Sequence, residues 1–293
     1  MNSERLHVPV LVRETTEMLM VKEDGIYVDA TVGLGGHAAE ILSMLGPGGA
    51  FIGIDRDPQA LDYARERLGN SRVRLVQGSF SRLEEILASQ DIEAIDGIVF
   101  DLGVSMLQLK QHERGFSFLS EERLDMRMDP SQELSAWEVV NRYSEKELER
   151  ILKEYGEEPK AKRIARAIVD RRRKAPLTTG AELAALVMSV YGGRGKTHPA
   201  TRTFQALRIE VNRELDELKS GLLAALGVLK TGGRMCVISY HSLEDRMVKN
   251  FIREQAREGK VKMLTKKPVT PGAGEMRSNP SSRSAKLRGA EKL

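Results

Sequence analysis

The chain has 293 residues, 41% of them hydrophobic and 30% charged, which is typical of a globular protein and excludes a chain that is disordered throughout. The net charge is only +4, and the single cysteine, Cys236, excludes an intramolecular disulfide framework and a cysteine-based structural zinc site. No apolar run approaches the roughly 18 residues of a membrane span. The N-terminus lacks the pattern of a signal peptide, so we expect a cytoplasmic protein with no membrane partner.

The first hundred residues alternate between expected strands and expected helices. Runs rich in β-branched and aromatic residues predict strands at 25–29, 50–55, 72–76 and 95–100. Helices are expected between them, at 37–45, 58–68 and 82–88. Asp57 is the expected N-cap of the second helix and Pro58 its first residue. Because the strands are almost continuously apolar, we predict an α/β fold with a Rossmann-like, doubly wound and mostly parallel sheet.

The alternation stops at residue 106 and resumes at residue 204. Between these positions the helices are expected at 136–141, 144–155, 160–173 and 179–191. A long helix from 204 to 229, ended by Gly232 and Gly233, then leads to further strands, expected at 234–239, 261–264 and 284–287. Ser242 and Asp245 are expected to cap the helix that follows the first of these strands. We predict one α/β core in two parts, 1–105 and 204–293, with a helical insertion at 106–203.

Positive charge is concentrated in two segments. Residues 159–176 contain eight Lys or Arg and one Asp, and residues 259–293 contain nine Lys or Arg and two Glu. Each segment has a net charge of +7, so the remainder of the chain has a net charge of −10. A solvated helix face and a solubilising tail would account for the two segments, and so would a polyanionic partner. The insertion is therefore a candidate polyanion-binding domain, and the second part of the core ends in a basic C-terminal tail.

A glycine-rich turn follows the first expected strand. Gly33, Gly35 and Gly36 precede the helix that starts at His37, where backbone N–H groups are free to meet a ligand. Asp55 ends the second strand, where a carboxylate can accept the hydroxyl groups of an adenosine ribose. A turn that serves only tight strand–helix packing is the alternative. The strand, the helix and the acid together favour a cofactor that contains adenosine.

The glycines alone do not identify that cofactor, because the same spacing fits a dinucleotide. Asp29 ends the first strand, where methyltransferases often have an acid that faces the methionine part of S-adenosylmethionine. A nicotinamide enzyme would normally need a hydride-relay residue beyond the fourth strand, and the chain has no clear Tyr-x-x-x-Lys motif. These features favour a methyltransferase over a dinucleotide-dependent oxidoreductase.

Polar side chains follow the fourth and fifth strands, where ligands of an open α/β sheet bind. Asp101, Ser105 and Gln108 follow the fourth strand, and Tyr240 and His241 follow the fifth. These residues are the candidates to contact a second substrate. A lone histidine such as His241 more often caps a helix than acts in catalysis.

Three further observations concern the chemistry of the site. Phe80 follows the third strand and can cover an adenine face. The histidines lack the spacing of metal ligands, so we expect no metal site. Cys236 lies inside the fifth strand and not at its end, which argues against a covalent cysteine mechanism.

Nine segments spread over nearly the whole chain resemble one family. They are HVPVLV from His7, DATVGLGGH from Asp29, GIDRDPQA from Gly53, DLGVS from Asp101, RGFSF from Arg114, LDMRMD from Leu124, RTFQALRIEVN from Arg202, ISYHSLEDR from Ile238 and SRSAKLR from Ser282. The order of RGFSF, LDMRMD and SYHSLEDR is highly specific. The chain resembles the bacterial small-subunit (16S) ribosomal RNA cytosine-N4 methyltransferases, a class I S-adenosylmethionine-dependent family. A non-catalytic RNA-binding or ribosome-assembly factor that retains this fold is the alternative.

The resemblance implies a cofactor, a partner and roles for the matching residues. The cofactor would be S-adenosylmethionine and the partner small-subunit ribosomal RNA, naked or within the assembled 30S subunit. A helical domain inserted into the methyltransferase core is a feature of the family, and the resemblance implies that the insertion at 106–203 is an RNA-binding domain. With Gly33 of the turn, the implied cofactor-binding residues are Gly35, Gly36, His37, Asp55, Phe80, Asp101 and Gln108.

The reaction expected from this resemblance needs little covalent chemistry from the protein. The sulfonium methyl group is already activated, so the protein chiefly positions the two substrates. The exocyclic amine of cytosine is a poor nucleophile, and a nearby hydrogen-bond acceptor would localise its lone pair and take its proton. We expect Asp101 or its loop to supply the acceptor, with Ser105, Tyr240 and His241 orienting the base. Pure cofactor binding is the alternative for Asp101.

The target base has to leave its stack to reach a buried cofactor. Phe116 and Phe118 are candidates to stack on the extruded base, with Arg114 on a phosphate. Aromatic residues in loops are more often small core anchors, and this alternative stays open for both.

Overall fold

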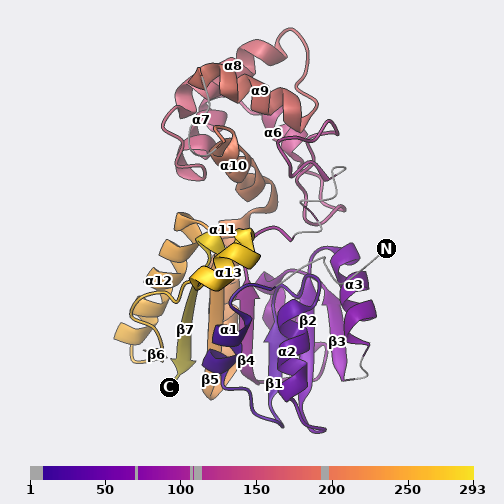
Figure 1. The fold of residues 1–293 in the computed structure, drawn as a ribbon, viewed down its shortest axis with the longest axis vertical. Coiled ribbons are helices and arrows are strands. Elements are labelled where there is room, and N and C mark those ends of the chain that lie inside the picture. Colours follow the sequence, from indigo (N-terminus) through magenta and orange to yellow (C-terminus); the bar gives the residue numbers. More distant parts are fainter. Residues whose placement is uncertain (1–8, 70–71, 106–107, 109–113, 193–197) are drawn as a thin grey trace. The chain divides into compact units, whose positions relative to one another are not determined.

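The computed structural model describes residues 9–69, 72–105, 108, 114–192 and 198–293. They belong to two compact units, which we describe separately (Figure 1). The sheet unit comprises the residues up to Gly103 together with Leu215–Leu293, and the helical unit comprises Val104–Glu214. The helical unit thus interrupts the sheet unit in the sequence, with boundaries at 104 and 214 where 106 and 203 were expected.

The sheet unit contains seven strands in the order β3-β2-β1-β4-β5-β7-β6. The strands are β1 (Ile26–Asp29), β2 (Ala50–Asp55), β3 (Val73–Gln77), β4 (Ile95–Asp101), β5 (Leu229–Ser239), β6 (Val261–Met263) and β7 (Lys286–Lys292). The pairs among β1 to β5 are parallel, and β7 is antiparallel to both β5 and β6. This sheet confirms the predicted doubly wound, mostly parallel α/β fold.

The register places the carboxyl ends of four strands at one edge of the sheet. Asp29 pairs with Val99 of β4, and Asp101 pairs with Ile238 of β5. Asp55 ends β2, the other neighbour of β1. The strand order reverses between β1 and β4, because β2 and β3 lie on one side of β1, and β4 and β5 lie on the other. Open α/β sheets bind their ligands at this kind of switch point.

Helices cover both faces of the sheet. They are α1 (Val12–Leu19), α2 (Gly36–Met44), α3 (Pro58–Leu68), α4 (Leu83–Ala88), α11 (Glu214–Val228) and α12 (Ser242–Arg257). The short helix α13 (Ala273–Ser278) has no buried residue. Neighbouring residues of a strand point to opposite faces, so Phe51 belongs to a cluster with α1, α2 and α3, and Ile52 to a cluster with α4, α11 and α12. As predicted, Asp57 caps α3 and accepts a hydrogen bond from the N–H of Gln59 at 3.1 Å.

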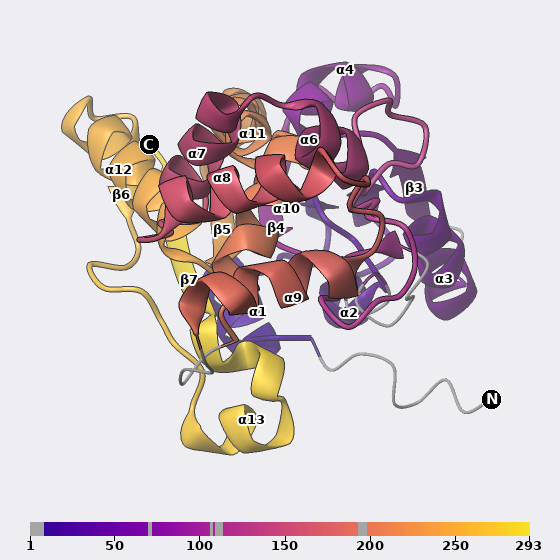
Figure 2. The ribbon, with the colours of Figure 1, turned by 90° about the horizontal axis from the view of Figure 1, so that it is seen from above.

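The helical unit has its own core. Its helices are α6 (Ala136–Arg142), α7 (Glu145–Glu154), α8 (Ala161–Arg172), α9 (Gly180–Tyr191) and α10 (Thr201–Asn212), and α8 packs against both α7 and α9 (Figure 2). The expected capping box of Thr179 and Glu182 is present at the start of α9. Apolar faces of all five helices meet in one cluster, which includes Ile164, Leu183 and Leu207. No helix within the described ranges is long and apolar enough to span a membrane.

Two expectations about the segment that leads into β5 are wrong. The long helix expected from 204 to 229 is two helices, because Arg213 adopts a φ of 50° and separates α10 from α11. Gly232 and Gly233 do not end a helix but lie inside β5, which begins at Leu229. Gly232 has a φ of 78°, and the register between β4 and β5 shifts at this level, so the glycines accommodate an irregularity of the strand.

Two expectations about the C-terminal part also need correction. His241 caps α12 in place of Ser242, because its Nδ1 accepts from the N–H of Glu244 at 3.4 Å. Asp245 instead forms an ion pair with Arg288 of β7, with 2.6 Å between Oδ1 and Nε. The basic C-terminal segment is therefore no tail, since β7 is hydrogen-bonded between β5 and β6.

Candidate functional site at the carboxyl edge of the sheet

The three glycines of the turn after β1 have different structural roles. Gly33 has a φ of 50° and Gly35 a φ of 74°, a region that side chains other than glycine rarely adopt. A Cβ atom at Gly36 would lie 2.7 Å from the Cβ of Pro9, so this glycine is needed for packing. At Gly33 the nearest atom to such a Cβ would be 3.7 Å away. Among the described residues, the turn leaves room for a ligand beside Gly33, and the contact with Pro9 supports the packing explanation for Gly36.

Asp55 lies beside this turn at the end of β2. Its Oδ2 accepts from the N–H of Gly33 and its Oδ1 from the N–H of Asp57, both at 2.9 Å. Burial raises the pKa of the carboxyl group to about 6, although these hydrogen bonds favour the charged form. The sheet thus holds an acceptor whose charge is poorly solvated, which suits a ligand that donates hydroxyl hydrogen bonds.

Asp29 and His37 are buried next to each other in the field of a further acid. Asp29 accepts from the N–H of Thr31 at 3.0 Å, and burial raises its pKa to about 7. Burial opposes protonation of His37, but Asp101 and Asp29 outweigh it and raise the pKa of the imidazole. Neither ring nitrogen of His37 has a hydrogen-bond partner among the residues that the structure describes. These buried, incompletely paired groups fit a ligand that carries positive charge and polar groups.

Asp101 ends β4 and connects three elements of the site. Its Oδ1 accepts from the hydroxyl of Tyr240 at 2.7 Å, and its backbone N–H donates to Thr31 Oγ1 at 2.7 Å. Its Oδ2 lies 3.4 Å from Nε2 of His37. Burial and the nearby carboxylate of Asp101 raise the pKa of Tyr240, so the phenol stays a donor. The sequence predicted Tyr240 at this edge of the sheet, and in the structure its hydroxyl group contacts the carboxylate of Asp101.

The ring of Phe80, which follows β3, is held by residues that the sequence did not identify. Its ring meets Phe100 edge-on at 5.4 Å between centroids, and the guanidinium of Arg56 lies 5.7 Å from its centroid. Arg56 forms an ion pair with Glu217 of α11 at 2.5 Å. A Cβ atom at Gly221 of α11 would lie 2.5 Å from the ring. Arg56 could have been identified from the sequence because it directly follows Asp55. No local sequence pattern identified Glu217.

A comparison with known proteins decides the family. The model of the MraW methylase family matches residues 4–293. The chain belongs to the MraW methylase family. A protein of Caldicellulosiruptor saccharolyticus named ribosomal RNA small subunit methyltransferase H is 51% identical over 304 residues, which cover 98% of this chain and 99% of that protein. A protein of the same name from Persephonella marina is 52% identical over 292 residues, with the same coverage.

This membership makes the chain a methyltransferase, and the oxidoreductase alternative is wrong. The predicted doubly wound, mostly parallel sheet is thus the fold on which this MraW-family chain builds its site.

Two of the expected site residues of this methyltransferase belong to the helical unit. The N–H of Ser105 donates to Oε1 of Gln108 at 3.1 Å, and the N–H of Gln108 donates to Ser105 Oγ at 3.2 Å. The pair therefore closes a local turn. The residues between and after them, 106–107 and 109–113, lie outside the described ranges.

His241 is already engaged by its own helix. Besides capping α12 through Nδ1, it has Nε2 at 3.2 Å from Glu244 Oε1. The capping alternative is thus the role that the structure displays for this histidine.

The aromatic residues of the RGFSF motif pack inside the helical unit of this methyltransferase. Phe116 is only 7% exposed and belongs to the core, as the core-anchor alternative expected. The ring of Phe118 stacks on His198 with 4.3 Å between centroids. Arg114 donates to the carbonyl groups of Arg127 and Met128. A stacking role of Phe116 and a phosphate contact of Arg114 are therefore not supported by these positions.

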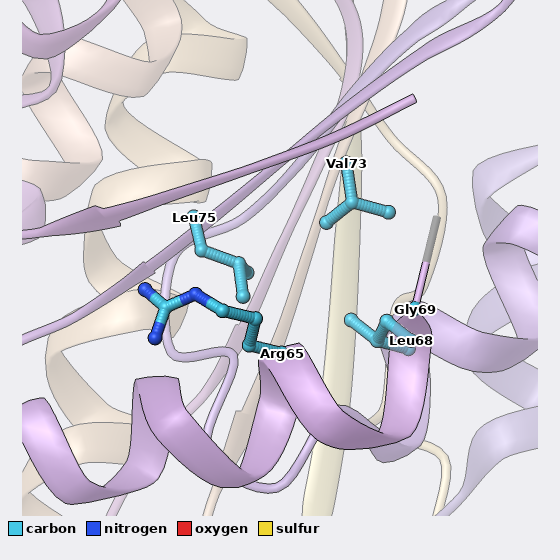
Figure 3. A pocket seen from close by; sticks show the side chains of 5 residues that line it. All are labelled: Arg65, Leu68, Gly69, Val73 and Leu75. Carbon is cyan, nitrogen blue, oxygen red and sulfur yellow. The ribbon is translucent and has the colours of Figure 1, made fainter. Parts of the chain in front are cut away.

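A pocket on the sheet unit of this MraW-family protein is lined by none of these residues, although Leu68 of its lining would lie 3.2 Å from a Cβ atom at Gly35. It is lined by Arg65, Leu68, Gly69, Val73 and Leu75, which come from α3, the residue after it, and β3 (Figure 3). None of the residues expected to bind the cofactor lines it. The carboxyl edge near Asp101, and not this pocket, is the candidate site.

Proposed function

We propose that this methyltransferase transfers the methyl group of S-adenosylmethionine to the N4 amine of a cytidine in small-subunit ribosomal RNA. The names of the relatives support the RNA, and the motifs RGFSF, LDMRMD and SYHSLEDR support the cytosine-N4 position. The observation that carries the proposal is the partly buried carboxylate of Asp101, which lies at the switch point between a phenol and an imidazole.

The residues at the switch point fit the proposed cofactor. Asp55 can accept the two ribose hydroxyl groups, and the open side of Gly33 lets the ligand approach the backbone. Asp29 and Asp101 supply negative charge where a sulfonium or an ammonium group has to be buried. Phe80, fixed by Arg56 and Glu217, can cover the adenine. When bound, the cofactor supplies a methyl group that is already activated for transfer.

Asp101 is the proposed acceptor for the amine of the base. Tyr240 donates to Oδ1 and thereby fixes the carboxylate, whereas Oδ2 faces His37. The carboxylate can accept a hydrogen bond from the target amine, localise its lone pair and take the proton that it loses. Nε2 of His37 lies 3.4 Å from Oδ2 of the same carboxylate. Ser105 and His241 are proposed to orient the base, and Gln108 is proposed to contact the cofactor. They follow β4 (Ser105 and Gln108) and β5 (His241).

The variant Asp101→Asn tests this assignment. With RNA and cofactor both saturating, we expect its single-turnover methylation rate to fall by roughly a hundredfold, the range of one general base. Calorimetry with S-adenosylhomocysteine separates this effect from cofactor binding. If cofactor affinity falls while the rate of the saturated enzyme does not, Asp101 only binds cofactor. Asp62→Asn, which removes an exposed carboxylate of α3, is the matched control.

The substrate is tested separately. Small-subunit ribosomal RNA from cells that lack this enzyme would be incubated with the protein and labelled S-adenosylmethionine. Mass spectrometry of the nucleosides is expected to show N4-methylcytidine. Incorporation of label into another nucleoside, or none into RNA, would contradict the proposal and favour a non-catalytic RNA-binding factor in the latter case.

A further inference from the structure

One side of α12 carries a row of cations. Arg246, Lys249, Arg253 and Arg257 recur at spacings of three, four and four residues, which places them on the same face of a helix. The three arginines are exposed, and Lys249 is partly buried. The opposite side of the helix packs into the core through buried residues such as Ile252. We name these four residues the basic stripe.

Three residues of the basic stripe are not neutralised by the described part of the sheet unit. The ion pairs that α12 makes among the described residues use His241 and Asp245, not Lys249, Arg253 or Arg257. Several exposed cations on other helices of the unit have partners three or four residues away. These pairs are Arg13 with Glu17, Arg65 with Asp62 and Arg82 with Glu85.

Folding alone does not favour such an arrangement. Lys249 is four residues before Arg253, and Arg253 is four residues before Arg257, and like charges at this spacing destabilise a helix. The helix dipole favours cations only in the last turn, which accounts for Arg257 but not for Arg246 or Lys249. A stripe that costs the helix stability is expected where a polyanion binds it.

The position of the stripe relates it to the methyl-transfer site of the same unit. The cap of α12, His241, directly follows Tyr240, which donates to Asp101. At 1.5 Å per residue, the stripe from Arg246 to Arg257 is about 16 Å long. The helix lies beside β6 and β7 (Figure 1). A nucleic acid strand whose target base reaches Asp101 therefore has a row of cations available for the phosphates next to that base.

We propose that the basic stripe of α12 binds the phosphate backbone of the substrate RNA next to the target nucleotide. This inference rests on the proposed function in its choice of RNA as the polyanion. Contacts from lysine and arginine to phosphate carry little sequence information but fix the register of the nucleic acid. The stripe holds the strand, and the residues around Asp101 act on the base.

The test removes three charges from the full-length protein as Lys249→Gln, Arg253→Gln and Arg257→Gln together. Binding of in vitro transcribed small-subunit ribosomal RNA is measured by filter binding over a series of salt concentrations. Each lost phosphate contact lowers the slope of log K against log salt by about 0.7–0.9, so we expect the slope to fall by about 2–3. At 0.1 M salt this corresponds to binding that is roughly a hundredfold weaker. Calorimetry with S-adenosylhomocysteine and the melting temperature should stay at wild-type values.

A second triple variant controls for net charge. Arg13→Gln, Arg65→Gln and Arg82→Gln remove the same charge from exposed, paired positions of the sheet unit. A wild-type slope in the stripe variant, or an equal loss in both variants, would overturn the proposal. Loss of binding to anionic phospholipid vesicles with unchanged RNA binding would also overturn it. If wild-type protein binds the RNA through the stripe but does not methylate it, the proposed function fails and the binding surface stands.

Discussion

Replacing Asp29 with asparagine should remove a pH dependence of stability from the ligand-free enzyme. Burial raises the pKa of Asp29 from 3.8 to about 7. A carboxyl group whose pKa is higher in the folded state stabilises the fold below its unfolded pKa, and this contribution is lost as the pH rises through about 7. Between pH 5 and pH 8 the two pKa values correspond to a loss of about 2–3 kcal/mol in the free energy of unfolding. Asparagine keeps an acceptor for the N–H of Thr31 but cannot ionise.

The assay is thermal unfolding of both proteins at pH 5 and pH 8 without ligand. At about 2–4 °C per kcal/mol, wild-type protein should lose roughly 5–10 °C more than Asp29→Asn between the two pH values. Asp96→Asn is the control of opposite sign, because Lys230 lies 2.7 Å from the Asp96 carboxylate and the pKa of that carboxyl group is lowered. The same pH dependence in wild type and Asp29→Asn would refute the reasoning that burial dominates the pKa of Asp29.

Three more substitutions test single contacts. Tyr240→Phe removes the 2.7 Å hydrogen bond to Asp101, so single-turnover methylation should slow about tenfold or more with cofactor affinity changed less than about threefold. Gly221→Ala places a methyl group 2.5 Å from Phe80, so calorimetry should show affinity for S-adenosylhomocysteine reduced by about fivefold or more. Arg172→Ala removes two hydrogen bonds to carbonyl groups at the end of α6, which should lower the melting temperature and leave the salt dependence of RNA binding unchanged.

The parts of the fold that depend on local chemistry were predictable. Asp57 caps α3 as expected, because an Asp-Pro pair favours a helix start regardless of its surroundings. Asp55 and Asp101 end apolar strands, and parallel strands bring such ends to one edge. The acids of the site could therefore be placed from the amino-acid sequence alone.

Other features depend on contacts between distant residues and left no local pattern. Gly232 and Gly233 have the composition of a helix end, yet pairing with β4 draws them into β5. Glu217 was missed because its role comes from Arg56, which reaches it from β2 across the fold. The net charge of residues 159–176 could be counted from the sequence, but the sequence did not show which of its cations are exposed. Arg172 forms hydrogen bonds inside the helical unit, whereas Arg163 is exposed.

The insertion also bears on how the methyl-transfer site is assembled during folding. Asp101 pairs in register with Ile238, although the whole helical unit lies between them in the chain. Closing so long a loop carries a large entropic cost if the intervening segment is unfolded, and pairing over such distances slows folding. A helical unit that folds first, around its own core, shortens the effective loop before β5 joins β4. Mutations that weaken this core should then slow the refolding of the distant catalytic edge, even where they touch neither substrate.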